Sequence, residues 1–219
     1  MRKVLIKSLL LLPALLSYGL AQAELTANVG ATTNYVFRGV TQTDDGPAIQ
    51  GGLDYVFDLN QNMGAYVGVW ASNVEDNAGN DGFEYDLYAG FQFEFAKDAK
   101  LDIGFIMYEY TDNNFADAEE IYLGASLKGF SAYYYDGEVS NNDYSYIDLR
   151  YTMPLPEDIF LTLHYGHFDN GFDADDIGVR VSKSMWDIDW SLAFTSYDRD
   201  NYDENNFFLM ATKTFNLGK

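Results

Sequence analysis

The feature that most constrains the fold is an alternation of apolar and polar residues with a period of two, in segments of about ten residues. The clearest segment is 83–95, where aromatic and aliphatic residues alternate with residues such as Glu84, Asp86 and Glu94. A strand separates these two sets onto opposite faces, whereas a helix would scatter both around its circumference. The pattern therefore predicts an all-β fold whose strands each have one apolar and one polar face.

Twelve segments fit this pattern, and an even count is typical of a bacterial transmembrane β-barrel with both termini on the periplasmic side. Two stretches, 66–71 and 130–135, are apolar or aromatic on both faces, so ten or fourteen strands remain alternatives. The predicted strands span residues 26–40, 47–57, 63–72, 82–95, 100–110, 119–127, 129–136, 143–153, 158–167, 175–183, 186–197 and 206–217.

The connections alternate between acidic loops and shorter turns, as in barrels with long outer loops and tight periplasmic turns. A soluble β-sandwich does not require this alternation of long and short connections. Aromatic residues near strand ends, among them Tyr35, Phe37 and Trp70, suit the two membrane interfaces, although ordinary core packing would also favour them. The acidic loops lie near 41–46, 73–81, 111–118, 137–142, 168–174 and 198–205, and Arg199 is their one basic residue.

The N-terminal residues have the organisation of a secretory signal peptide. Basic residues at the start precede an apolar run over 9–16, and Ala21-Gln22-Ala23 supplies the small residues of a cleavage site. We expect a signal peptide over 1–23 and one barrel domain over 24–219. Export would place the barrel in the bacterial outer membrane, with outer-membrane lipid and lipopolysaccharide as its surroundings. Because the chain has no cysteine, we expect neither a lipoprotein anchor nor a disulfide.

Several kinds of chemistry are disfavoured. A formal net charge of −21 would repel nucleic acid. The histidines, His164 and His167, lie three apart on a predicted strand, so their side chains face opposite sides and cannot share a metal. The acidic segment 169–176 lacks the EF-hand spacing. We therefore expect no catalysis, no cofactor and no bound metal.

If the apolar faces contact lipid, the polar faces line the lumen. Acidic residues outnumber arginines there, and acidic rings select cations in channels. This predicts a wet, negative lumen that prefers cations; the alternative is an interior closed by salt bridges and hydrogen bonds. The predicted pore-lining residues are Arg38, Asp54, Glu84, Asp86, Glu94, Asp102, Glu120, Asp148, Arg150, Arg180, Asp187 and Asp189.

Arg38 is the most informative of these residues. The pattern places it on the lumen side of the first strand, where a buried guanidinium requires a carboxylate partner. Asp54 and Asp86, on nearby predicted strands, are the expected partners. A fixed salt bridge is favoured over a role in binding substrate.

Four stretches carry a family resemblance: Tyr35-Val36-Phe37-Arg38-Gly39, then 47–55, 66–73 and 84–90. They resemble the TorF-type porin family of Gram-negative bacteria. The resemblance is specific over about residues 28–91 and rests on strand pattern afterwards. It implies an outer-membrane barrel and suggests transport, without an established substrate or catalytic residues. The C-terminal residue, Lys219, departs from the aromatic residue that ends many such barrels.

Together these observations predict an antiparallel barrel of about twelve strands that acts as a passive pore for small solutes or cations. One alternative is a closed structural or surface-interaction barrel that displays acidic loops. The other is a soluble periplasmic β-protein.

Overall fold

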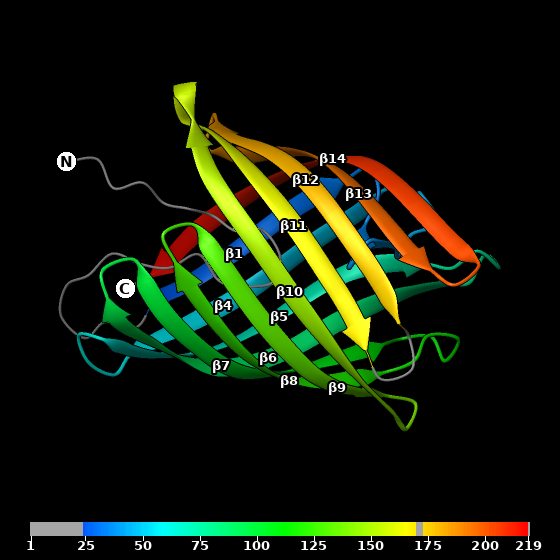
Figure 1. Ribbon diagram of the computed structural model, residues 1–219, viewed down its shortest axis with the longest axis horizontal. Helices are drawn as coiled ribbons and strands as arrows, with labels where there is room; N and C mark the ends of the chain where they lie inside the picture. Colours follow the sequence, from blue (N-terminus) through cyan, green and yellow to red (C-terminus); the bar gives the residue numbers. More distant parts are fainter. Residues whose placement is uncertain (1–23, 170–172, 219) are drawn as a thin grey trace.

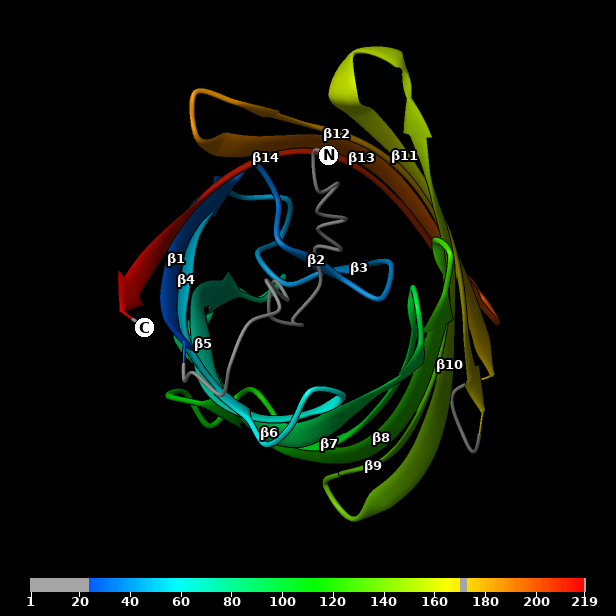
Figure 2. The same cartoon turned by 90° about the vertical axis from the view of Figure 1, so that its left-hand side faces the viewer.

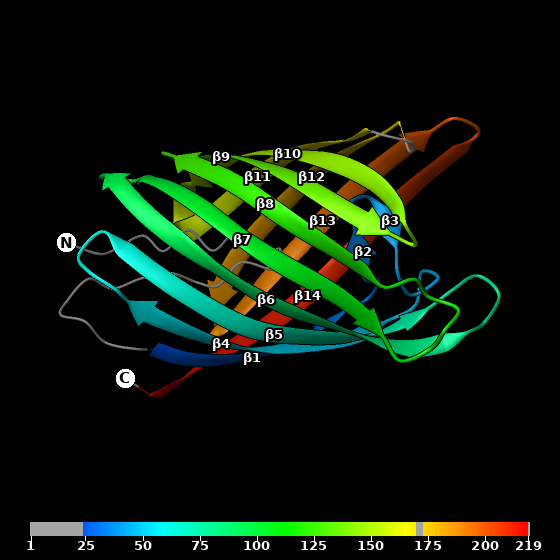
Figure 3. The same ribbon diagram turned by 90° about the horizontal axis from the view of Figure 1, so that it is seen from below.

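The computed structural model describes residues 24–169 and 173–218, and in them twelve antiparallel strands close into a single barrel (Figures 1 and 3). The predicted fold class and strand count are confirmed, whereas the expected signal peptide, 1–23, lies outside the described residues. Within those described ranges, no helix is long and apolar enough to cross a membrane. The barrel strands are β1 (Glu24–Thr32), β4 (Ala48–Asp58), β5 (Met63–Glu75), β6 (Asp81–Ala96), β7 (Ala99–Tyr110), β8 (Ala118–Leu127), β9 (Phe130–Val139), β10 (Asn142–Leu155), β11 (Ile159–Asp169), β12 (Ala174–Met185), β13 (Ile188–Arg199) and β14 (Tyr202–Gly218).

The two ends of the barrel differ. The pairing of Leu25 with Gly218 closes the barrel and puts both ends of the described chain at one end, which we call the terminal end. The opposite end, called the loop end, carries the connection between β1 and β4. Both ends are visible in Figure 3, with the start of β1 and the end of β14 on the left.

The outer surface is apolar along the strands. On β6, Phe83, Leu87 and Phe91 are 60%, 41% and 54% exposed, whereas Glu84 and Asp86 between them are 2% and 0% exposed. An isolated protein in water would hide the first set and expose the second. The inverted arrangement is that of a barrel surrounded by lipid, with its polar residues facing inward.

The first predicted strand, 26–40, is wrong in its second half. The barrel strand β1 ends at Thr32, and Thr32 pairs directly with Ala48 of β4, so the wall is continuous without the intervening residues. Those residues, 33–47, fold into the lumen and form the short strands β2 (Val36–Phe37) and β3 (Val40–Thr41). We call residues 33–47 the loop hairpin; Figure 2 shows β2 and β3 inside the ring of barrel strands.

The loop hairpin also corrects the expected position of three aromatic residues. Tyr35 is only 5% exposed, and its ring packs edge-on against Trp70 with centroids 5.4 Å apart. Phe37 packs against Tyr108 at 5.7 Å. The three rings therefore fill the lumen instead of marking a membrane interface. Tyr35 and Phe37 do so because the hairpin does not belong to the wall, and Trp70 because it lies on the lumen face of β5, paired with Asp86.

Tight turns correct two further expectations. Ser140 and Asn141 both have positive φ (51° and 62°) and join β9 to β10 directly, so the loop expected at 137–142 is a two-residue turn. Trp186 and Asp187 have φ of 56° and 57° and join β12 to β13 in the same way. Asp187, expected to line the lumen, is therefore an exposed turn residue.

Lumen-facing tyrosines lie over lumen-facing glycines of the adjoining strand. Tyr66 is paired with Gly90, and Tyr122 with Gly104. A Cβ atom on Gly104 would lie 2.4 Å from the Tyr122 hydroxyl oxygen and 2.8 Å from the carbonyl oxygen of Ala89. Only glycine allows the ring to lie this close to the neighbouring backbone.

We expect Gly104→Ala to destabilise the folded barrel by about 1–3 kcal/mol, because the added methyl displaces the Tyr122 ring and strains its surroundings. The matched control is Gly178→Ala, since a Cβ atom on Gly178 would meet its nearest neighbour at 3.4 Å, an ordinary contact. Urea unfolding of both variants in lipid vesicles measures the difference. Equal midpoints would show that the glycine is not needed for the packing of the tyrosine.

Candidate functional site: the lumen

The lumen has two chemically different sides. The side formed by β4 to β9, called the tyrosine wall, combines carboxylates with tyrosine rings. The side formed by β10 to β13, called the arginine wall, carries Arg150 and Arg180 together with small residues such as Gly178 and Ala193. Tyr66, Tyr88, Tyr108, Tyr110, Tyr122, Tyr133 and Tyr135 belong to the tyrosine wall.

On the tyrosine wall, most carboxylates accept hydrogen bonds from tyrosine hydroxyls. Tyr66 donates to Asp102 at 2.8 Å and also contacts the hydroxyl of Tyr122. Tyr88 donates to Asp54. The expected alternation is therefore present, but these acids are buried behind aromatic rings and are already engaged.

Two carboxylates near the loop end differ in how they are satisfied. Glu84 accepts a hydrogen bond from Tyr110 at 2.9 Å. Asp86 is fully buried, and among the described residues neither of its oxygen atoms has a hydrogen-bond partner. Burying an unpaired ionised carboxylate is costly, so Asp86 does not stabilise the fold as a charged group.

Arg38 lies at the tip of the loop hairpin, not on a barrel strand as expected. It has a φ of 46° and is followed by Gly39 at 84°, which together turn the chain between β2 and β3. Its partner is also different from the expected Asp54 or Asp86: both terminal nitrogens donate to Glu120 of β8, at 2.5 and 2.9 Å. The reason is that the hairpin carries Arg38 across the lumen to β8, away from β1.

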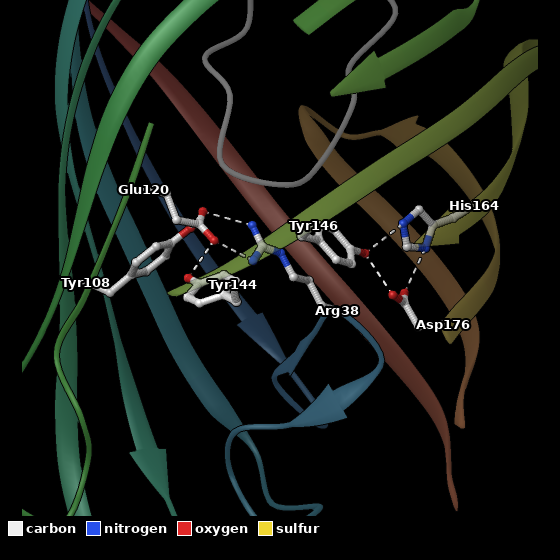
Figure 4. A network of polar contacts seen from close by, with 7 residues as sticks. All are labelled: Arg38, Tyr108, Glu120, Tyr144, Tyr146, His164 and Asp176. Atoms are coloured by element: carbon white, nitrogen blue, oxygen red, sulfur yellow. Dashed lines mark hydrogen bonds and ion pairs between the residues drawn. The ribbon is translucent and has the colours of Figure 1, made fainter. Parts of the chain in front are cut away.

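The contacts around this ion pair fix the hairpin (Figure 4). Tyr108 and Tyr144 donate to Glu120 at 2.8 and 2.7 Å. The Arg38 guanidinium lies 4.1 Å from the ring centroid of Tyr146, a cation–π distance. Next to Arg38, the Gly39 carbonyl accepts a hydrogen bond from Asn206 of β14. The hairpin is thus attached to both sides of the barrel.

On the arginine wall, two carboxylates lie beside basic side chains. Asp148 accepts a hydrogen bond from Arg150. His164 lies between two acids, with Nε2 3.4 Å from Asp148 and Nδ1 3.2 Å from Asp176. Tyr146 donates to the second oxygen of Asp176 at 2.8 Å, and the ring of the same Tyr146 stacks on Arg38. Tyr146 therefore connects Asp176 and His164 to the loop hairpin (Figure 4).

A cavity lies against the arginine wall, between the loop hairpin and the terminal end. Its hairpin boundary is formed by Val36, Arg38 and Gly39, and its wall by residues of β10 to β14. Charged, hydroxyl and aromatic side chains all contribute to the lining. They include Arg150, Phe160, Thr162, His164, Asp176, Arg180, Ser182, Asp189, Ser191, Thr195 and Phe208.

The predicted lumen residues are therefore divided between two environments. Ten of the twelve lie on barrel strands, in the positions that alternate with exposed apolar residues, whereas Arg38 is on the hairpin and Asp187 is in a turn. The strand members of the tyrosine wall are Asp54, Glu84, Asp86, Glu94, Asp102 and Glu120; those of the arginine wall are Asp148, Arg150, Arg180 and Asp189.

Sequence reasoning missed the tyrosine hydroxyls and the small residues opposite the arginines. The tyrosines alternate in phase with the acids of their strands: Glu84, Asp86 and Tyr88, for example, are each two residues apart. This shared phase is the sequence signal that places the tyrosine hydroxyls on the lumen face. Nothing in the sequence indicated which strands would face each other across the lumen.

The two histidines lie on opposite sides of the barrel wall, as predicted. His164 faces the lumen, where its contacts are Asp148, Asp176 and Tyr146. His167 lies on the outer surface, with Nδ1 3.0 Å from Asp175. Within the described parts of the chain, no group of three histidine or acidic side chains could hold a metal ion.

Solved structures with the same architecture are mostly outer-membrane channels. An outer membrane channel from Pseudomonas putida F1 is 12% identical, with a TM-score of 0.66 over 90% of this chain and 97% of that one. The KdgM porin is 11% identical, with a TM-score of 0.55 over 87% and 99%. Outer membrane phospholipase A from Escherichia coli is 9% identical, with a TM-score of 0.50 over 89% and 96%. At these identities the likeness shows the fold alone.

Two further comparisons concern the sequence. A family model described as "Bacterial protein of unknown function (Gcw_chp)" matches residues 19–214. None of the curated proteins matches. The barrel fold is that of bacterial outer-membrane proteins and the neighbours are porin-like, but neither comparison supports the TorF label specifically.

Proposed function

Because the chain belongs to the Gcw_chp family of bacterial proteins of unknown function, we propose a function from the geometry of its lumen: an outer-membrane porin for passive diffusion of small solutes. Outer-membrane lipid and lipopolysaccharide would contact its apolar surface. The signal peptide expected over 1–23 would direct its export and then be removed.

The observation that carries this proposal is the cavity against the arginine wall. A barrel with a purely structural role would fill its interior with side chains, as small barrels do. Here the small residues Gly178, Ala193 and Ser191 leave space on one side of the lumen, and polar groups line it. The porin-like fold of the solved neighbours supports the same proposal.

The loop hairpin favours a second candidate, a closed barrel that displays its outer loops. Its attachments to β8 and β14 cross the lumen near the loop end, where any path through the barrel must pass beside them. In the porin proposal the hairpin narrows the path, and in the closed-barrel proposal it blocks the path.

We propose no enzymatic role. One solved neighbour is a phospholipase, but its likeness concerns the fold. The lumen histidine, His164, is held by two carboxylates and a tyrosine, an arrangement that fixes a side chain and does not activate a serine.

The test is single-channel conductance of the protein purified from outer membranes, in a planar bilayer. We expect discrete conductance steps from the wild type, and steps several-fold larger when an Asn-Gly turn replaces residues 33–47. This replacement is possible because Thr32 and Ala48 are paired, so a two-residue turn can join them. Silence from both inserted proteins would overturn the porin proposal. Silence from the wild type alone, with steps from the variant, would favour the closed barrel.

The cation preference inferred from the acid count stays a prediction. Five of the six acids of the tyrosine wall are buried, whereas the cavity is lined by acids and arginines together: Asp176, Asp189, Arg150 and Arg180. The reversal potential under a KCl gradient reports the sign of the selectivity. If the buried acids set it, Asp86→Asn and Glu84→Gln will reduce the preference for cations.

A further inference from the structure

Two arginines converge on the same cavity from strands that flank β11. Arg150 is paired with His164 across β10 and β11, and Arg180 is paired with Thr162 across β11 and β12. Both line the cavity. Guanidinium groups bind carboxylates through charge-assisted and often bidentate hydrogen bonds, so two of them on one wall are suited to an anionic group.

The acids nearest to Arg150 leave several of its donors available. Arg150 makes one hydrogen bond, through Nη2 to Asp148, among the described residues, and a guanidinium has five N–H donors. Asp176 accepts from Tyr146 and lies 3.2 Å from His164. One oxygen of each carboxylate accepts a hydrogen bond, and the other lies within 3.4 Å of a ring nitrogen of His164. These two acids leave most of the Arg150 donors unused.

Hydroxyl groups lie beside the arginines on the facing strand. Ala193 of β13 is directly opposite Arg180, and Ser191 and Thr195 stand two positions to either side of it on the same face. Ser191 is only 6% exposed, and within the described residues the hydroxyl oxygens of Ser191 and Thr195 have no hydrogen-bond partner. A buried hydroxyl is normally satisfied, so these two are suited to a polar ligand in the cavity.

Apolar surface completes the lining. The rings of Phe160 and Phe208 border the same cavity, while Gly178 and Ala193 leave room beside Arg180. A ligand that matches this surface has a negative group, several hydroxyls and an apolar C–H face. Those three properties occur together in small polyhydroxylated carboxylates, the class of the sugar acids.

We propose that the cavity is a binding site for a small polyhydroxylated carboxylate, with the carboxylate at Arg150 and Arg180 and hydroxyls at Ser191 and Thr195. This rests on the proposed porin function, because it names the solute class that the lumen admits. The loop hairpin forms one boundary of the site through Arg38, whose charge is already neutralised by Glu120.

The test is isothermal titration calorimetry on the protein purified from outer membranes, in detergent. The two ligands are D-glucuronate and D-glucose, which differ only by a carboxylate in place of a hydroxymethyl group. We expect glucuronate to bind at least tenfold more tightly. Arg180→Gln should weaken glucuronate binding by about tenfold, and Arg180→Lys by less, because the charge stays and the bidentate geometry is lost. Arg199→Gln, at the loop end of β13, is the matched control and should bind as the wild type does.

Three results would overturn the proposal: no glucuronate binding, equal binding of glucose, or binding of inorganic phosphate as tight as that of glucuronate with no effect of Ser191→Ala. The last would show a simple oxyanion site. A shift in gel-electrophoretic mobility between unheated and heated samples verifies that each variant is folded. Conductance measured in parallel separates the two proposals: steps without glucuronate binding would contradict the site alone, and binding without steps would contradict the pore alone.

Discussion

Arg38→Ala is expected to destabilise the folded barrel by about 3–5 kcal/mol, because it leaves Glu120 buried without its cation. Glu120 is 1% exposed, and Arg38 supplies two of its hydrogen bonds. The substitution also removes the stacking of the guanidinium on Tyr146. Urea unfolding in lipid vesicles measures the change.

A double-mutant cycle distinguishes this ion pair from general damage to the lumen. The Arg38→Ala, Glu120→Ala double variant leaves no unpaired charge, so we expect it to be more stable than Arg38→Ala alone. Arg199→Ala controls for loss of an arginine outside the hairpin. If the stability losses of Arg38→Ala and Glu120→Ala simply added in the double variant, the attachment of the hairpin to β8 would contribute little to stability.

Leu87→Arg is expected to cost about 2–4 kcal/mol, because it places a charge on the lipid face of the barrel away from the interfaces. Leu87 lies mid-strand, paired with Val69 and Met107, and is 41% exposed on the outer surface. The unfolding midpoint in lipid vesicles and the yield of folded protein both report this cost.

Gln92→Arg is the matched control, on the same strand but on the lumen face. Gln92 already donates to Asp102 at 3.4 Å, and an arginine there can pair with the same carboxylate. We therefore expect a much smaller effect. If Gln92→Arg were the more damaging of the two, the assignment of faces to lipid and lumen would be reversed.

The sequence alone determined the wall of the barrel. Because strand side chains alternate strictly between two faces, the period-two pattern of segments such as 83–95 fixed the strands, and with them the inward direction of Glu84, Asp86 and Asp102. The same argument separated His164 from His167. These are local properties, since each follows from the order of residues within one segment.

Tertiary structure decided what the lumen contains. The pattern of residues 33–47 is compatible with a strand, and only closure of the wall by the pairing of Thr32 with Ala48 directs that segment into the interior. The partner of Arg38 is therefore Glu120, 82 residues away, which local pattern cannot identify. Likewise the cavity exists because β10 to β13 bring arginines and small residues together on one side. Which side chains meet across a barrel depends on its closure and stagger, and no single segment of the sequence encodes them.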